Sequence, residues 1–107
     1  MIEKLDQKEY LSKVTEKKET VLIDFYASWC GPCKMYAPVL EKVSENAAIP
    51  FYKMDIDEAP EIAERLRIMS VPTIKIFQGG REAGSMTGVR SEADLRKFIE
   101  STVPVIR

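Results

Sequence analysis

The stretch Val21–Cys33 reads VLIDFYASWCGPC, and it places a pair of cysteines shortly after an almost uninterrupted apolar run. The run Val21–Ala27 is rich in β-branched, aliphatic and aromatic residues, which predicts a central strand buried on both faces. After Cys33, apolar residues recur at helical spacing, which predicts a long helix that contains Pro38. The two cysteines therefore lie where a buried strand passes into a helix.

Upstream of this stretch, the sequence predicts one short strand and one helix. Residues Ile2–Leu5 form the strand, and Asp6 with Glu9 three residues later resembles a capping box that opens the helix. We expect Leu11 and Val14 to face inward from that helix.

Downstream, strands and helices continue to alternate and the chain closes with a hairpin and a helix. The predicted elements are the strand Pro50–Ile56, a helix capped by Asp57, a half-buried strand Thr73–Phe77, a two-residue turn at Gly79–Gly80, a return strand Glu82–Thr87 and a helix capped by Ser91. This order predicts an α/β fold: a three-layer α/β/α sandwich with a mixed five-stranded sheet and four helices, parallel in its first half. We expect one domain over residues 1–107.

Composition narrows the possible functions. The 107 residues carry 16 Lys and Arg against 17 Asp and Glu, a net charge of −1, with two cysteines and no histidine. This balance argues against nucleic-acid binding, and no apolar run is long enough to predict a signal peptide or a membrane span. Without histidine there is no imidazole catalysis, and two cysteines cannot form a four-thiolate zinc site. We expect a cytoplasmic protein with no metal and no cofactor, in which the thiols carry the chemistry.

Cys30 and Cys33 are the candidate catalytic pair. Unpaired amides and the helix dipole favour a thiolate at a helix N-terminus, and Pro32 fits a first helical turn. We expect Cys30, before the helix, to be the exposed nucleophile and Cys33 to be the shielded resolving thiol. The alternative is that both are small core residues or half of an intermolecular metal site.

Asp24 is unusual because it falls within the strand that is predicted to be buried on both faces. Burial raises the pKa of a carboxyl group, which would make Asp24 a proton acceptor for Cys33 near neutral pH, directly or through a water. Lys53, in the neighbouring predicted strand, is a candidate partner that tunes Asp24. The alternatives are an aspartate that bonds only solvent or backbone amides, and a lysine whose ammonium group simply reaches solvent.

Residues Asp24–Lys34 (DFYASWCGPCK) closely resemble the signature of the thioredoxin family. The resemblance covers essentially the whole chain, including the Val71–Thr73 segment, the Gly79–Gly80 turn and Gly88. It implies the thioredoxin fold and a small, monomeric protein-disulfide reductase that is recharged by a thioredoxin reductase. Its substrates would be disulfide-containing proteins such as peroxiredoxins and other reductive enzymes.

The same resemblance implies roles for individual residues. Cys30 would attack, Cys33 would resolve, Asp24 would act as the buried acid or base, and Lys53 would be its neighbour. The loop before Pro72 would face the dithiol, with Pro72 cis, although an ordinary trans proline is the alternative. A flat apolar rim would receive partners, and it comprises Trp29, Gly31, Pro32, Val71 and Gly88. Trp29 could also serve packing alone. Tyr26 departs from the family pattern, which commonly has Trp there.

Two other functions remain open on the sequence. In the family, Gly-Pro between the cysteines goes with reductants, whereas oxidants and isomerases carry a histidine there, which would make the disulfide more oxidising. A thiol oxidase or isomerase is therefore the weaker alternative. The other is a binding subunit in which the fold serves as a partner surface and redox activity is incidental.

Overall fold

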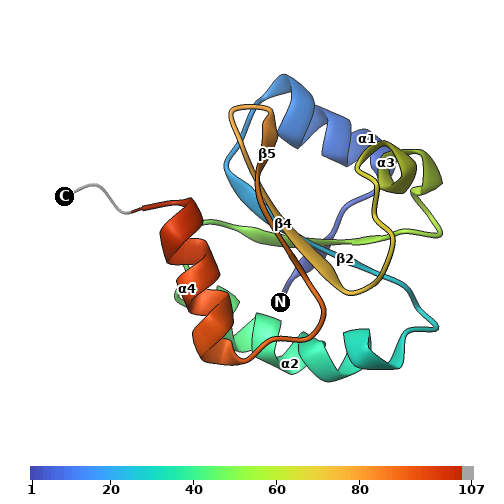
Figure 1. Cartoon of the computed structure of the whole chain (residues 1–107). Coiled ribbons are helices and arrows are strands. Elements are labelled where there is room, and N and C mark those ends of the chain that lie inside the picture. The colour runs from blue at the N-terminus through green and yellow to red at the C-terminus, as the bar shows by residue number, and fades with distance from the viewer. Residues whose placement is uncertain (105–107) are drawn as a thin grey trace.

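A mixed five-stranded sheet forms the middle layer of the computed structural model, which describes residues 1–104 (Figure 1). Its strand order is β1-β3-β2-β4-β5, in which β3 runs parallel to β1 and β2, while β4 runs antiparallel to β2 and β5. The strands are β1 (Glu3–Lys4), β2 (Val21–Tyr26), β3 (Phe51–Asp55), β4 (Thr73–Gln78) and β5 (Arg81–Thr87). The predicted mixed sheet, parallel in its first half with a hairpin at its edge, is confirmed.

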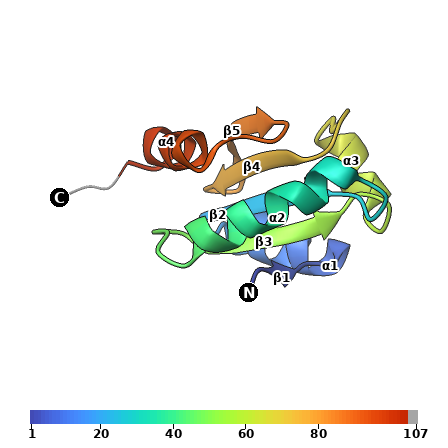
Figure 2. The ribbon, with the colours of Figure 1, turned by 90° about the horizontal axis from the view of Figure 1, so that it is seen from below.

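Helices cover both faces of this sheet. They are α1 (Gln7–Tyr10), which continues directly as the π-helical segment η1 (Leu11–Glu16), α2 (Gly31–Ser44), α3 (Pro60–Arg65) and α4 (Glu92–Thr102). Helices α2 and α4 lie on one face, and α1 and α3 on the other (Figures 1 and 2). The three-layer α/β/α sandwich predicted from the element order is therefore confirmed.

Strand β2 is the centre of both hydrophobic cores. Leu22 packs with the core beneath α2 and α4, whereas Ile23 and Phe25 pack with the core beneath α1 and α3. All three side chains are at most 1% exposed. Successive side chains of a strand point to opposite faces, so the apolar run fills both layers at once.

The first helix differs from the prediction at Leu11, which is exposed. The capping box of Asp6 and Glu9 is present, but the helix widens to a π-helix from Leu11 onward. Tyr10 and Val14, four residues apart, are the buried pair. The prediction that Leu11 faces inward assumed α-helical spacing, and a π-helix rotates the inward face away from it.

Asp57 does not cap the third helix, contrary to the prediction. Helix α3 begins at Pro60, its N-cap position is Ala59, and no side chain caps it. The backbone N–H of Asp57 donates to Asp55 Oδ1 at 2.9 Å, so these residues form a tight turn before the helix. Proline is well suited to open a helix because the missing N–H has no partner there in any case.

The sequence predicts a half-buried β4, yet Thr73–Phe77 is buried throughout. The lysine between two isoleucines suggests a solvent-facing side of the strand, but Lys75 is itself buried. Its Nζ donates to Glu82 Oε1 at 2.8 Å and to Ser85 Oγ at 3.2 Å, both on the neighbouring strand β5. The Gly79–Gly80 turn between these strands is as predicted, and both glycines have positive φ, the conformation that such a two-residue turn needs.

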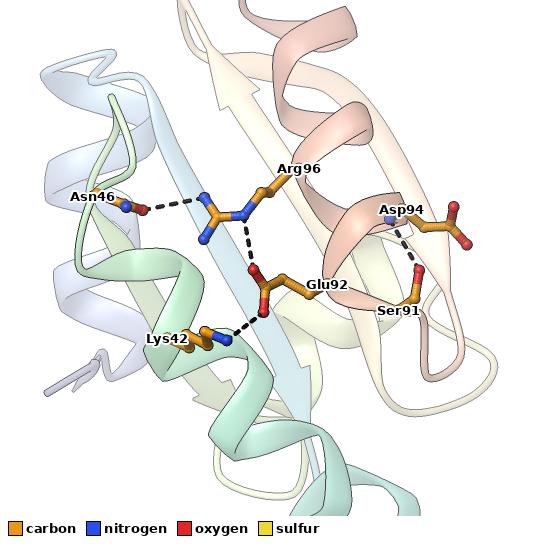
Figure 3. A network of polar contacts seen from close by, with 6 residues as sticks. All are labelled: Lys42, Asn46, Ser91, Glu92, Asp94 and Arg96. Atoms are coloured by element: carbon orange, nitrogen blue, oxygen red, sulfur yellow. Dashed lines mark hydrogen bonds and ion pairs between the residues drawn. The ribbon is translucent and has the colours of Figure 1, made fainter.

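Polar contacts join α4 to α2 at the surface (Figure 3). Glu92 pairs with Lys42 at 3.1 Å and with Arg96 at 3.2 Å, and Arg96 also donates to Asn46 Oδ1 at 3.1 Å. Ser91 caps α4, as predicted, by accepting from the Asp94 N–H at 3.0 Å. This network fixes the last helix beside the one that begins with the cysteine pair.

The buried Lys75 leads to a stability prediction. Glu82→Ala leaves a buried ammonium group without its carboxylate, so we expect the free energy of unfolding to fall by about 2 kcal/mol. Lys75→Met removes the charge and keeps the volume, so it should cost clearly less. Urea denaturation of both variants measures the difference, and an equal loss in the two would contradict this account.

Candidate active site

Cys30 and Cys33 are joined by a disulfide at the start of α2. Their Cα atoms lie 5.3 Å apart. Cys30 is the N-cap residue of the helix, and the backbone N–H of Cys33 points to its sulfur with an N to Sγ distance of 3.2 Å. An unpaired amide of the first helical turn is thus aimed at the Cys30 sulfur, the arrangement that stabilises a thiolate.

Both cysteines are shielded, which corrects the prediction that Cys30 is exposed. Cys30 is 4% exposed and Cys33 is 5% exposed. They pack with Ala27, and the partly buried Val71 lies against them. The Cys30 sulfur is 3.7 Å from the Val71 carbonyl oxygen, so a segment distant in sequence covers it. Position on the helix alone could not reveal this cover.

Pro72 and Gly88 lie together next to this contact. The Val71–Pro72 peptide is cis, and Pro72 is buried directly before β4. The Pro72 carbonyl accepts a hydrogen bond from the Gly88 N–H at 2.8 Å. Gly88 has a φ of +87°, a conformation that favours glycine. Two of the predicted rim residues, Val71 and Gly88, are therefore brought to the loop that faces the disulfide.

Asp24 is buried, at 7% exposed, as the sequence predicts. It lines a pocket of about 180 Å³ together with Cys33, Lys34 and Lys53. Its Oδ1 atom is buried and has no hydrogen-bond partner within the described residues. Burial raises the pKa of Asp24 to about 7, and the positive charge of Lys53 acts in the opposite direction. A carboxyl group that titrates near neutral pH therefore shares a pocket with the inner cysteine.

Lys53 lies beside Asp24 but does not form a direct ion pair with it. The two residues are register partners in the parallel β2–β3 ladder, so their side chains leave the same face of the sheet. The Lys53 ammonium nitrogen lies 5.7 Å from the centre of the Tyr26 ring. The predicted neighbourhood of Asp24 and Lys53 is thus present, with an aromatic ring that the sequence prediction did not connect to them.

The predicted rim is largely open to solvent around the disulfide. Trp29 is 69% exposed, Gly31 and Pro32 are exposed, and Val71 and Gly88 are partly exposed. The Trp29 Nε1–H donates to Asp57 Oδ2 at 2.8 Å, which explains what Asp57 does instead of capping α3. The indole is therefore held over the surface and not in the core.

Sequence reasoning missed three exposed apolar side chains that belong to the same segments. They are Met35, Met69 and Val89, at 74%, 92% and 46% exposed. Met35 follows Cys33 by two residues, Met69 precedes Val71 by two, and Val89 follows Gly88 directly. Their closeness in sequence to Cys33, Val71 and Gly88 was the signal that could have identified them as surface residues. Helical spacing and hydropathy alone assign such apolar residues to a core.

Residues 1–104 contain no group of three or more Cys, Asp or Glu side chains placed to hold a metal ion. None of their helices has the length and apolar character needed to cross a membrane.

Comparisons with known proteins agree with this site. The family model described as Thioredoxin matches residues 1–101. The chain is 38% identical over 96 residues to Thioredoxin-2 of Saccharomyces cerevisiae, a match that covers 89% of this chain and 91% of that protein. It is 37% identical over 97 residues to the Bifunctional thioredoxin reductase/thioredoxin of Mycobacterium leprae, a match that covers 89% of this chain but only 21% of that protein.

A solved structure is similar over nearly the full length. A mutant thioredoxin from Halobacterium salinarum NRC-1 superimposes with a TM-score of 0.84 at 35% sequence identity, covering 98% of this chain and 93% of that one. The family match, the fold and the intact cysteine pair point the same way. The chain belongs to the thioredoxin family and is a thiol–disulfide oxidoreductase that reduces protein disulfides.

Proposed function

We propose that Cys30 is the attacking thiol and Cys33 the resolving thiol of this reductase. The observation that carries the proposal is the disulfide at the helix N-terminus, with one amide aimed at Cys30 and the Asp24 pocket reaching Cys33. In the first step the Cys30 thiolate attacks one sulfur of a substrate disulfide and expels the other as a thiolate, which leaves a mixed disulfide. The Cys33 thiolate then attacks the Cys30 sulfur, expels the second substrate thiolate and forms the Cys30–Cys33 bond.

The two cysteines are suited to different steps. Cys30 is the N-cap residue, where the helix dipole and the Cys33 amide stabilise negative charge on its sulfur. Cys33 lies within the first turn and lines the Asp24 pocket, so its proton has an acceptor nearby. Asp24, with its pKa raised to about 7, would take that proton as Cys33 attacks and hand it back to the expelled thiolate or to water.

The rim would receive the substrate. Trp29, Gly31 and Pro32 flank the cysteines in sequence, Val71 packs against them, and Gly88 donates a hydrogen bond to Pro72, the residue after Val71. The exposed Met35, Met69 and Val89 side chains would extend this apolar surface. A shielded Cys30 sulfur needs a substrate that approaches between these segments. An extended chain that lies against the loop before Pro72 would present its disulfide to Cys30 and leave its own backbone groups able to bond that loop.

Electrons would come from a thioredoxin reductase. The relative from Mycobacterium leprae is named as a single chain that combines a thioredoxin reductase with a thioredoxin, which supports such a partner for this protein. Disulfide-containing proteins such as peroxiredoxins would be the acceptors. Two cysteines used for thiol–disulfide exchange suit a reducing compartment, so the protein would act in the cytoplasm. We expect it to act as a monomer.

The order of attack can be tested with single cysteine variants. Cys30→Ser should abolish reduction of a protein disulfide when a thioredoxin reductase supplies electrons, because the attacking thiolate is gone. Cys33→Ser should instead accumulate a mixed disulfide between Cys30 and the substrate, since the resolving step is lost. Non-reducing gels and mass spectrometry detect this adduct. Full activity of Cys30→Ser, or an adduct on Cys33, would reverse the assignment.

The role of Asp24 can be tested through pH. Asp24→Asn should slow the resolving step by roughly a hundredfold near pH 7, because no acid or base then serves Cys33. The rate of wild-type resolution should rise with a midpoint near pH 7, and the variant should lose this midpoint. Stopped-flow kinetics from pH 5 to pH 9 measures it, and an unchanged pH profile would leave Asp24 without a catalytic role.

Stability gives an independent readout of the same residue. The pKa of Asp24 is raised in the folded protein from 3.8 to about 7, so the folded state holds a proton that the unfolded chain releases. The wild type should therefore lose stability relative to Asp24→Asn as pH rises from about 4 to 7, whereas below that window the difference between the two proteins should not change with pH. Urea denaturation at fixed pH values tests whether this carboxyl is neutral when buried.

The choice between a reductase and an oxidant or isomerase depends on Pro32. Pro32→His places an imidazole beside the Cys30 sulfur, where its cationic form stabilises the thiolate and so favours the reduced protein. We expect the variant disulfide to be more oxidising than that of the wild type in equilibration with glutathione. Pro32→Ser is the matched control, because it removes proline without adding a charge. A wild type as oxidising as Pro32→His would favour the isomerase function.

A further inference from the structure

Tyr26 lines the same pocket as Asp24, Cys33 and Lys53. Asp24 and Tyr26 are two residues apart on β2, so both side chains leave the face of the sheet that α2 covers. Lys53 leaves the same face of β3, opposite Asp24. The ring of Tyr26, the Lys53 ammonium and the Asp24 carboxylate thus form one group of neighbours.

Lys53 has a limited choice of partners. Within residues 1–104 it forms no ion pair, and its ammonium lies 5.7 Å from the centre of the Tyr26 ring. On its other side, its register partner on β1 is Lys4, which is itself paired with Glu58 at 2.8 Å. The Glu58 carboxylate on the β1 side is therefore already engaged by Lys4, whereas the Tyr26 ring and the Asp24 carboxylate lie on the β2 side.

Within the described residues the Tyr26 hydroxyl accepts no hydrogen bond from Lys53, so the contact between the two side chains is made through the ring. Burial raises the pKa of Tyr26, with Lys4 acting in the opposite direction, so the phenol is uncharged at neutral pH. A cation within about 6 Å of an aromatic ring centre is attracted to the ring face. The contact holds the ammonium group near the pocket instead of in open solvent.

We propose that Tyr26 is a positioning residue that holds the Lys53 ammonium beside the Asp24 carboxylate. The proposal rests on the proposed role of Asp24 and identifies what adjusts it: Lys53 favours the ionised carboxylate, and the ring determines how much of the time Lys53 is there. Loss of the ring would release Lys53 toward solvent. The effect of burial, which raises the pKa of Asp24, would then no longer be opposed by a nearby positive charge.

The other groups that face Asp24 do not replace this pair. From α2 come Cys33, the exposed Lys34, and the buried Tyr36, whose pKa is raised to about 12 by burial and, secondarily, by the charge of Asp24. From β4 the register partner is Ile74, which carries no charge. Lys53 is the cation that lowers the pKa of Asp24.

The experiment is a titration of the Asp24 side-chain carboxyl carbon by NMR in the oxidised protein, in a double-mutant cycle. Tyr26→Leu removes the ring, Tyr26→Phe keeps it, and each is measured with Lys53 present and in the Lys53→Met background. Tyr52→Leu is the matched control, because the Tyr52 ring carries Lys13 at 5.3 Å on the opposite face of the sheet. Tyr26→Met replaces Tyr26→Leu if the latter does not fold.

With Lys53 present, Tyr26→Leu should raise the titration midpoint of Asp24 by roughly half a pH unit, while Tyr26→Phe and Tyr52→Leu leave it unchanged. In the Lys53→Met background, Tyr26→Leu should produce no rise. A fall in both backgrounds would show that the ring acts by excluding water, and an equal rise in both would show that it acts without Lys53. Either result overturns the proposal.

These outcomes are separable from the catalytic role of Asp24. The titration reports the carboxyl group whether or not it assists Cys33, whereas the pH profile of the resolving step reports that assistance. If the midpoint shifts as expected but the profile of resolution does not follow it, the positioning role stands and the proton-transfer role of Asp24 fails. If neither Tyr26→Leu nor Tyr26→Met moves the midpoint, the positioning role fails by itself.

Discussion

The burial of β2 on both faces is the constraint on which the rest of the structure depends. A strand whose side chains fill two cores needs helices above and below it and neighbours on both edges, which β3 and β4 provide. Its carboxyl end leads through the short segment Ala27–Cys30 into α2, the helix that covers one of the two faces. The cysteine pair lies at this junction, so the same burial that stabilises the sheet determines where the chemistry takes place.

Asp24 breaks the rule that the rest of β2 follows. A carboxyl group in a buried strand is difficult to ionise, and an apolar residue of similar size would stabilise the fold. The structure retains it in a pocket that reaches Cys33, with one oxygen that has no partner among the described residues. Stability is thus given up at one position for a group that titrates near neutral pH, a pattern typical of functional sites.

Much of the fold and the core of the site could be predicted from the sequence, because patterns along the chain determine them. The apolar run predicts β2, and the Gly79–Gly80 pair predicts the hairpin. Some errors are local, such as the π-helix that exposes Leu11, and others concern contacts that form only in the folded chain. Val71 shields Cys30, the Trp29 indole donates a hydrogen bond to Asp57, and Glu82 forms an ion pair with the buried Lys75. The first two pairs are far apart in sequence, so local spacing could not reveal them. Lys75 and Glu82 face each other across the predicted hairpin, but the alternating pattern assigns the lysine to the solvent side.

The hydrogen bond between Trp29 and Asp57 has an optical consequence. Trp29 is the single tryptophan of the chain, it directly precedes Cys30, and its indole is exposed yet held by Asp57 at 2.8 Å. Intrinsic indole fluorescence therefore originates entirely at the residue that precedes the redox pair, from a ring that one hydrogen bond holds. The protein thus carries its own optical label next to the cysteine pair, with no need for an added dye.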